Sequence, residues 1–145
     1  MKENLLVSAC LVGENCRYNK KVMTNDAVVA LRKEYHLILV CPEVMGGLAV
    51  PRLPAEQYKG KVLNSVGEDL TKYFERGAQK AAELALQYKC KKAVLKERSP
   101  SCGCGEIYDG TFSGNLISGN GVTAEMLLKL GLEVIGESKV NKISK

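Results

Sequence analysis

Three cysteines lie at the end of a short apolar run or in the loop that follows one, so their thiols share one kind of setting. Cys10 and Cys41 each end such a run, and Cys102 lies in a loop of proline, glycine and serine at residues 99–105, after a third run. Short apolar runs bounded by turn residues are typical of buried strands. If the three runs are parallel neighbours in one sheet, their thiols meet at its carboxyl edge, where open α/β sheets bind ligands. The sequence therefore predicts sulfur chemistry at that edge.

The six cysteines are compatible with a zinc site, a redox pair, an iron–sulfur site or plain packing. A structural zinc site uses four Cys or His ligands in close pairs, whereas Cys102 and Cys104 form the one short pair and His36 is the one histidine. The Cys-x-x-Cys spacing of redox exchange is absent from the sequence. Thiolates also hold iron–sulfur clusters, usually four at a time, and three leave one iron open to act as a Lewis acid. Buried cysteines also serve as small hydrophobic residues, and spacing alone leaves a site and plain packing equally open.

The apolar periodicity predicts the elements that position these thiols. Strands are expected at residues 4–9, 37–40, 92–96 and 132–135, and helices at 25–35, 69–88 and 123–130. A short strand or hairpin arm is expected at 62–64, and Asp-Gly between aromatic and β-branched residues predicts a hairpin at 108–112. Because strands alternate with helices, we expect a single three-layer α/β domain with a mostly parallel sheet of about four strands, in a Rossmann-like arrangement.

Two loops that follow predicted strands have the composition of ligand-binding loops. The first, residues 11–21, contains glycine, asparagine and Arg17. The second, residues 42–56, contains three prolines and an adjacent pair of glycines, which disfavour a regular element. This second loop places the carboxylate of Glu43 two residues from a thiol. Cys90 instead precedes a predicted strand, so it lies at the opposite edge of the sheet and we assign it no role.

The composition fits one globular domain over residues 1–145, with 46% hydrophobic and 26% charged residues. No apolar stretch is long enough to cross a bilayer and the N-terminus lacks the features of a signal peptide, so we expect a cytoplasmic protein with no membrane partner. Disulfides rarely persist in a reducing cytosol, which favours metal binding or catalysis for clustered thiols. The formal charge of +5 attracts anionic ligands such as nucleotides or RNA, although solvated surface lysines are the simpler explanation.

Three groups of residues, in order along the chain, resemble the signatures of a bacterial family. They are Ser-Ala-Cys-Leu-Val-Gly at 8–13 with Arg17 and Tyr18, Cys-Pro-Glu at 41–43 with 47–48 and 51–54, and Lys96 with Ser-Pro-Ser-Cys-Gly at 99–103. The family is that of domain of unknown function 523, whose members are identified as thiouracil desulfidases. The resemblance covers nearly the whole chain.

The resemblance implies a [4Fe-4S] cluster held by three cysteines, which correspond here to Cys10, Cys41 and Cys102. It also implies a catalytic acid and a hydroxyl, which we place at Glu43 and Ser101. Two further thiols lie outside the family pattern and are candidates to replace or supplement a ligand, namely Cys16 and Cys104.

The implied reaction is the non-redox removal of sulfur from a thiolated pyrimidine, giving uracil or uridine and sulfide. A water activated by Glu43 would attack the ring carbon, and Ser101 would hydrogen-bond a ring heteroatom or relay a proton. Arg17 and Arg52 are candidates to hold the pyrimidine oxygens or a phosphate, and a structural ion pair is equally open for Arg52. The backbone N–H groups of four glycines are expected to point at the cluster sulfurs, those at positions 46, 47, 103 and 105.

The substrate class and two other functions stay open at this point. The thiolated substrate is a free base, a nucleoside, a nucleotide or RNA, and the oligomeric state is not predicted. One alternative is a non-enzymatic iron–sulfur or zinc protein that senses or stores metal. Another is a nucleotide- or RNA-binding module whose cysteines are structural.

Overall fold

A four-stranded parallel sheet forms the centre of the computed structural model, which describes residues 2–14, 16–19 and 24–143. In spatial order the strands are β2 (Tyr35–Val40), β1 (Glu3–Ser8), β5 (Lys92–Leu95) and β8 (Glu133–Gly136). All neighbouring pairs run parallel. The predicted α/β fold with a mostly parallel sheet is confirmed, and the observed strand ends lie within about two residues of the expected ones.

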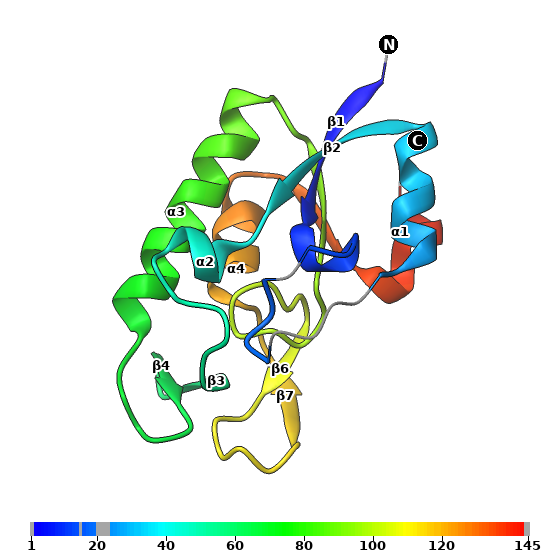
Figure 1. Ribbon diagram of the computed structural model, residues 1–145. Coiled ribbons are helices and arrows are strands. Elements are labelled where there is room, and N and C mark those ends of the chain that lie inside the picture. The colour runs from blue at the N-terminus through cyan, green and yellow to red at the C-terminus, as the bar shows by residue number, and fades with distance from the viewer. Residues whose placement is uncertain (1, 15, 20–23, 144–145) are drawn as a thin grey trace.

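Helices cover both faces of the sheet and produce the expected three layers (Figure 1). Helices α3 (Thr71–Gln87) and α4 (Val122–Lys129) lie on one face, and α1 (Asp26–Ala30) lies on the other with the 3₁₀ turns of Glu137–Lys142. Each face has its own apolar core.

The central strand β1 contributes to both cores. Leu6 packs on the α3 and α4 side, whereas Leu5 and Val7 pack on the α1 side. All three side chains are fully buried. A strand covered on both faces needs apolar residues at every position, which explains the unbroken apolar run in the sequence.

Helix α1 is much shorter than the helix expected at 25–35. It begins as predicted, because the Asn25 side chain accepts a hydrogen bond from the backbone N–H of Val28 at 3.1 Å. After Ala30 the chain tightens into a 3₁₀ turn, Leu31–Lys33, and then enters β2. Tyr35 is buried in the α1-side core, so its packing starts the strand where the helix was expected to continue.

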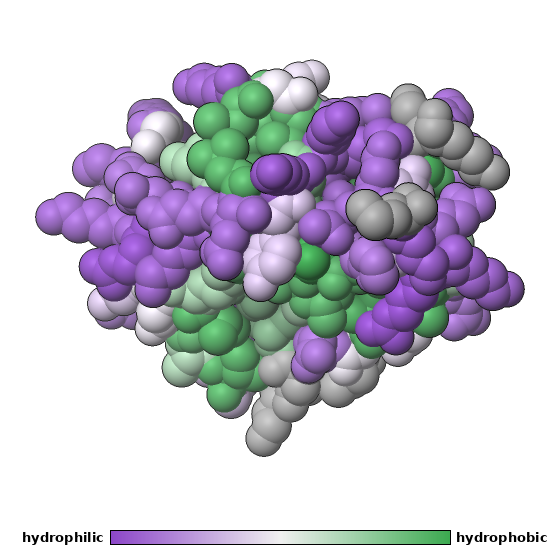
Figure 2. Space-filling model, turned by 90° about the horizontal axis from the view of Figure 1, so that it is seen from above, coloured by the Kyte–Doolittle hydropathy of each residue, from purple (hydrophilic) through white to green (hydrophobic). Residues whose placement is uncertain are grey.

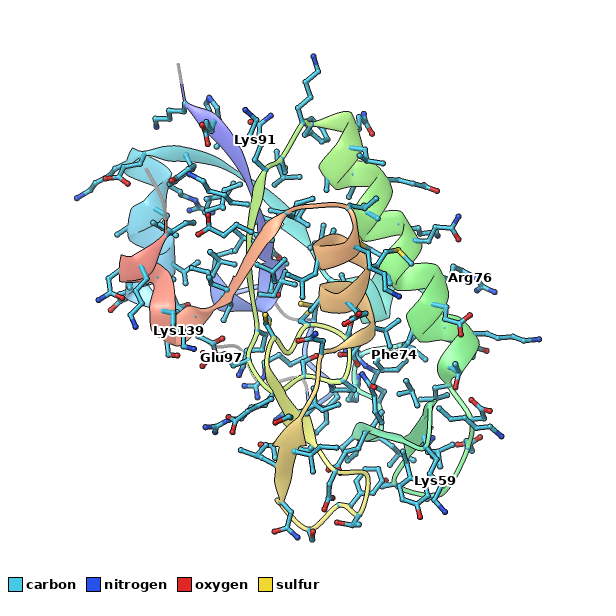
Figure 3. The ribbon with its side chains drawn as sticks, turned by 180° about the vertical axis from the view of Figure 1, so that it is seen from behind. Lys59, Phe74, Arg76, Lys91, Glu97 and Lys139 are labelled. Atoms are coloured by element: carbon cyan, nitrogen blue, oxygen red, sulfur yellow. The ribbon has the colours of Figure 1, made fainter. Side chains whose placement is uncertain are left out.

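Helix α3 separates an inner apolar face from an outer polar one. Phe74 is fully buried and points toward the interior, whereas Arg76 points away from it (Figure 3). The expected helix at 69–88 is confirmed with small differences at both ends. Gly77 and the alanines on the inner face of α3 are all buried, so this face can pack closely on its neighbours.

A short helix, α2 (Pro42–Met45), lies in the loop where no regular element was expected. The prediction was wrong because proline is well tolerated at the first helical position, where the missing N–H has no partner in any case. The following glycines, Gly46 and Gly47, end the helix after one turn.

Two antiparallel hairpins lie beyond the carboxyl ends of the sheet strands (Figure 1). One joins β3 (Ala55–Tyr58) to β4 (Lys61–Asn64), which confirms the predicted arm at 62–64. The other joins β6 (Glu106–Tyr108) to β7 (Leu116–Ser118) through residues 109–115. The hairpin predicted at 108–112 therefore exists with a longer loop than the Asp-Gly signal indicated.

The opposite end of the molecule, where the strands begin, is mostly hydrophilic with hydrophobic patches between the charged groups (Figure 2). Among its exposed side chains are those of Arg32, Lys33 and Lys91. Within the described residues, no helix has both the length and the apolar character needed to cross a membrane.

Candidate active site

A cavity of about 490 Å³ opens at the carboxyl ends of β1, β2 and β5. Its walls come from the ends of these strands, from α2 and from the two hairpins. The lining includes four cysteines, several charged groups and aromatic rings, among them Cys10, Cys16, Arg17, Tyr18, Cys41, Glu43, Arg52, Lys96, Ser99, Cys102, Tyr108 and Phe112.

The three thiols that follow neighbouring strands all line this cavity. Cys10 lies in the 3₁₀ turn after β1, Cys41 precedes the first turn of α2 after β2, and Cys102 lies in the loop after β5. The strand order β2-β1-β5 brings the three strand ends together. The predicted meeting of these cysteines at the carboxyl edge is what the structure shows.

Cys16 is a fourth thiol in the same cavity. Its side chain hydrogen-bonds with both Cys10 and Cys41, and the Cys41 thiol also contacts the Cys16 carbonyl oxygen at 3.6 Å. The hydrogen bond with Cys10 raises the pKa of Cys16 to about 11, and burial raises the pKa of Cys102 to about 12. The pKa of Cys41 is also raised, first by its hydrogen bond with Cys16. Without a metal, these groups are therefore neutral thiols at pH 7.

Cys90 and Cys104 lie away from this group. Cys90 is buried in the core beneath α3 and α4. The Cys104 thiol donates a hydrogen bond to the Val134 carbonyl oxygen at 3.4 Å and packs against the same core. Neither is among the described residues that line the cavity.

Glu43 and Arg52 form an ion pair on the cavity wall, with Nε and Oε1 3.2 Å apart. Both side chains are largely enclosed, with exposed fractions of 19% for Glu43 and 10% for Arg52. Burial raises the pKa of the Glu43 carboxyl, and the guanidinium opposes that rise. The other carboxylate oxygen, Oε2, has no hydrogen bond with the described part of the chain.

Arg52 is also bonded to two backbone carbonyls. Its Nη1 donates to the oxygen of Ala49 at 2.9 Å and its Nη2 to the oxygen of Cys16 at 3.0 Å. Together with the Glu43 ion pair, these contacts connect the loop of Cys16 and the loop of Ala49 to a single guanidinium. Lysine lacks this planar set of hydrogen-bond donors. The structural ion-pair role that was left open for Arg52 is the one its contacts support.

Three further cations line the cavity, Arg17, Lys96 and Arg98, and they differ in their contacts. Arg17 lines the cavity and has no hydrogen bond or ion pair with the described part of the chain. Lys96 pairs with Glu137 at 3.1 Å and donates to the Glu97 carbonyl oxygen. Arg98 also lines the cavity, and its Nε lies 4.0 Å from Oε1 of Glu106. Arg17 is therefore the cavity guanidinium without a partner in the described part of the chain.

Ser101 is not placed on the cavity. Its side chain is fully buried, and its hydroxyl shares a 2.8 Å hydrogen bond with the hydroxyl of Thr123. Ser8 at the end of β1 lines the cavity, and the serine of this loop that lines it is Ser99. Its oxygen accepts hydrogen bonds from the backbone N–H groups of Ser101 at 3.1 Å and Cys102 at 3.0 Å. A serine before a tight loop often makes such bonds, so the Ser-Pro-Ser-Cys pattern contained the signal that sequence reasoning missed.

The four glycine N–H groups expected at the cluster are bonded within the chain, so that prediction was wrong. Gly46 donates to Pro42, Gly47 to Val44 and Gly103 to Ser99 through backbone oxygens. Gly105 donates to the side chain of Asn120. At Gly46 and Gly103 the glycine is required for packing, because an added Cβ would lie 2.0 Å from the Tyr73 oxygen and 2.8 Å from the Ser99 oxygen.

The donor set of the cavity fits a thiolate-held cluster. Among the described residues, no three Cys, His, Asp or Glu side chains surround a single point as ligands of one metal ion would. A cluster has a different requirement, because each cysteine binds its own iron and the sulfurs stand around the cluster instead of meeting at a point. Three thiols from three separate strand ends, lining one cavity, meet that requirement.

The fold and the cavity define a class: a parallel α/β protein with a thiol-lined site at the carboxyl edge of its sheet. The chain belongs to the 2-thiouracil desulfurase family, whose model matches residues 5–139. The family resemblance stated from the sequence is therefore confirmed.

A relative and a solved structure are similar to this chain over nearly its whole length. The chain is 41% identical over 149 residues to the uncharacterized protein YbbK of Bacillus subtilis (strain 168), covering 96% of this chain and 99% of that protein. It is 40% identical to the [4Fe-4S]-dependent thiouracil desulfidase TudS (DUF523Vcz), whose structure matches with a TM-score of 0.91 over 97% of this chain and 95% of the other.

Proposed function

We propose that this protein is a [4Fe-4S]-dependent desulfidase that converts a thiolated pyrimidine of the thiouracil or thiouridine type into uracil or uridine and sulfide. The observation that carries the proposal is the meeting of Cys10, Cys41 and Cys102 on one cavity wall beside the carboxylate of Glu43. The family and the similar structure of a thiouracil desulfidase support the same activity.

Cys10, Cys41 and Cys102 are the proposed ligands of the cluster. When bound through three thiolates, a [4Fe-4S] cluster supplies an iron with an open position, which acts as a Lewis acid toward a thione sulfur. Cys16 lies beside two of these ligands and is not assigned to the set. The pKa values of the Cys41 and Cys102 thiols are raised, so these thiols must release their protons when they bind the cluster as thiolates.

Glu43 is the proposed general base. Its Oε1 is held by Arg52, which leaves Oε2 to accept a proton from the water that attacks the ring carbon. Burial makes the carboxylate a stronger base than an exposed one, because it raises the pKa of the group. Arg52 keeps the carboxylate in place, so the same ion pair orients the base and limits the rise in its pKa.

The remaining polar groups are proposed to orient the substrate. The Ser99 hydroxyl accepts hydrogen bonds from two backbone N–H groups, so its own proton is available to a ring heteroatom or a leaving group. Ser101, the residue first proposed for that task, acts through its hydrogen bond with the Cys102 thiol. Arg17 is the proposed partner of the pyrimidine oxygens, or of a phosphate if the substrate has one.

We propose that residues 1–145 form one domain. We also propose that the protein is cytoplasmic. All six cysteines are free, which suits a reducing compartment. A base, nucleoside or nucleotide is the proposed class of substrate, and thiolated RNA is the larger alternative.

The experiment is anaerobic reconstitution with iron and sulfide, followed by incubation with 2-thiouracil and with 4-thiouracil. We expect stoichiometric sulfide and uracil from at least one of them, measured by a colorimetric sulfide assay and chromatography. A cluster-containing protein that releases no sulfide from either compound would contradict the proposal and favour a metal sensor. A protein that takes up no iron would favour the binding module.

A further inference from the structure

Two residues on the cavity wall have a left-handed backbone although they lie neither in a two-residue hairpin turn nor at the end of a helix. Four described residues other than glycine have a positive φ: Lys59, Lys89, Arg98 and Phe112. Lys59 lies in the two-residue turn between β3 and β4, and Lys89 lies in the turn that closes α3, where this conformation is usual. Arg98 and Phe112 neither end a helix nor close such a turn, and both line the cavity.

The loop that contains Phe112 is held by a carboxylate from the other hairpin. Glu56 of β3 is buried, and its Oε1 accepts hydrogen bonds from the backbone N–H groups of Gly110 at 3.0 Å and Phe112 at 3.1 Å. Within the loop, Oδ1 of Asp109 accepts from the backbone N–H of Thr111 at 2.9 Å. A bulky residue stays in the left-handed region only when its surroundings fix it in this way.

The phenyl ring of Phe112 remains available at that position. Its exposed fraction is 38%, although the residue lines the cavity and its backbone is fixed. Tyr18 and Tyr108 add aromatic surface to the same cavity. An aromatic ring that is held rigidly and left partly uncovered on a cavity wall is suited to stack against a planar ligand.

We propose that Phe112 stacks against the pyrimidine ring of the substrate and that Glu56 is the residue that positions it. The inference rests on the proposed function and adds the basis of its substrate selectivity: planar heteroaromatic thiones are accepted, and small non-aromatic thiocarbonyl compounds such as thiourea are not. Stacking depends on the ring face and not on its substituents, so Phe112 contributes equally to the binding of 2-thio and 4-thio compounds.

The test compares binding of uracil, which is not consumed, to the reconstituted wild-type protein and to Phe112→Gly. Glycine favours a positive φ, so this change removes the ring and relieves the backbone. We expect the Kd for uracil, from equilibrium dialysis, to rise about tenfold, which is typical of removing one base-stacking ring. The melting temperature should stay the same or rise. Thiourea, dialysed in the same way, should bind both proteins equally weakly.

Three further variants separate stacking from a structural role. Phe112→Tyr keeps a ring and should bind uracil like the wild type, whereas Glu56→Ala should weaken uracil binding because it frees the loop. Ile117→Ala changes an exposed residue of β7 that does not line the cavity and should leave binding unchanged. The proposal is overturned if Phe112→Gly binds uracil normally, if its melting temperature falls, or if Phe112→Tyr fails to retain binding.

The outcome also separates this inference from the proposed function. If wild-type protein binds uracil through Phe112 but releases no sulfide from 2-thiouracil, the desulfidase activity is wrong and the stacking stands. If sulfide is released and Phe112→Gly has an unchanged Kd and KM, the activity stands and the stacking is wrong.

Discussion

Glu43 and Arg52 show how a sequence can reveal a reactive group without revealing what holds it. The carboxylate was predicted near a thiol because only two positions separate it from Cys41. The partner is nine positions further along, beyond a loop whose path spacing cannot predict. Ser101 and Ser99 differ for a similar reason, since two hydroxyls in one loop point in different directions and only one reaches the cavity.

At Glu43 we predict a loss of the rate of sulfide release without a loss of the cluster. Glu43→Gln keeps the shape and a hydrogen-bond acceptor for Arg52 but cannot accept the proton of the attacking water. We expect sulfide release from 2-thiouracil to fall by roughly 10²- to 10⁴-fold, the usual contribution of a general base. Iron content, measured on the same samples, should match the wild type.

Glu83→Gln is the matched control, because Glu83 is exposed on α3 and far along the chain from the cavity residues. It should retain both activity and iron. If Glu43→Gln releases sulfide at the wild-type rate, Glu43 is not the base.

The cysteines provide a second prediction at this scale. Cys10→Ala, Cys41→Ala and Cys102→Ala should each remove most of the visible absorption of the reconstituted cluster. Cys90→Ala should retain it, because Cys90 packs in the core and does not line the cavity. Cluster content is compared among the four proteins by their visible spectra and by iron analysis. Full cluster content in any of the first three variants would remove that residue from the ligand set.

At the scale of elements, the contact between α2 and α3 places both Cys41 and Glu43. Gly77 of α3 faces Pro42, and a Cβ at Gly77 would lie 1.8 Å from the Pro42 carbonyl oxygen. Helical spacing predicted α3, but it does not show which element packs against Gly77. Because α2 itself was not predicted, its contact with α3 could not be.

Gly77→Ala tests whether this contact sets the site. In an ordinary helix, alanine is more stable than glycine by roughly 0.5–1 kcal/mol. Here the added methyl must displace α2, so we expect a loss of stability of about 1–3 kcal/mol in urea unfolding, as for other overpacked contacts. Cluster content should also fall, because Cys41 moves with α2.

The exposed neighbour Gln79 offers a control on the same helix. Gln79→Ala should change the free energy of unfolding by no more than about 0.5 kcal/mol, as most surface substitutions do. It should also leave the cluster content unchanged. A Gly77→Ala protein as stable as the wild type, with a full cluster, would show that the contact tolerates the methyl group.

Local signals predicted the elements better than their lengths. The strands and the long helix follow from unbroken apolar runs and helical spacing, and they match closely. Helix α1 and the β6–β7 loop depart from the prediction because distant groups decide them: the core packing of Tyr35 ends one, and the carboxylate of Glu56 shapes the other. Such long-range contacts are invisible to a window of neighbouring residues.

At the scale of the whole molecule, the site depends on the order of the strands. Sequence predicted that three thiols would meet if their strands were neighbours, and the order β2-β1-β5 satisfies that condition. The proposed ligands therefore follow three different strands, at widely separated points along the chain. A cluster bound to all three cysteines would connect these strands at the carboxyl edge of the sheet. It can do so only when the chain is folded.

Cluster binding should accordingly stabilise the whole fold. A ligand that binds only the native state raises the free energy of unfolding by an amount that grows with its affinity. We expect the reconstituted protein to melt several degrees above the cluster-free protein under anaerobic conditions, as measured by circular dichroism. In Cys41→Ala, reconstitution should leave the melting temperature unchanged. Equal melting temperatures for the two forms of the wild type would show that the cluster is not bound by the folded core.

The proposed function is the desulfuration of thiolated pyrimidines by means of a cluster in the cavity. Its most direct test is the initial rate of 2-thiouracil consumption, followed by the loss of thione absorbance, in wild-type samples reconstituted to different iron contents. We expect a rate that rises in proportion to cluster content and extrapolates to zero without it. A rate that does not depend on cluster content, or its absence in fully loaded protein supplied with either 2-thiouracil or 4-thiouracil, would contradict the claim.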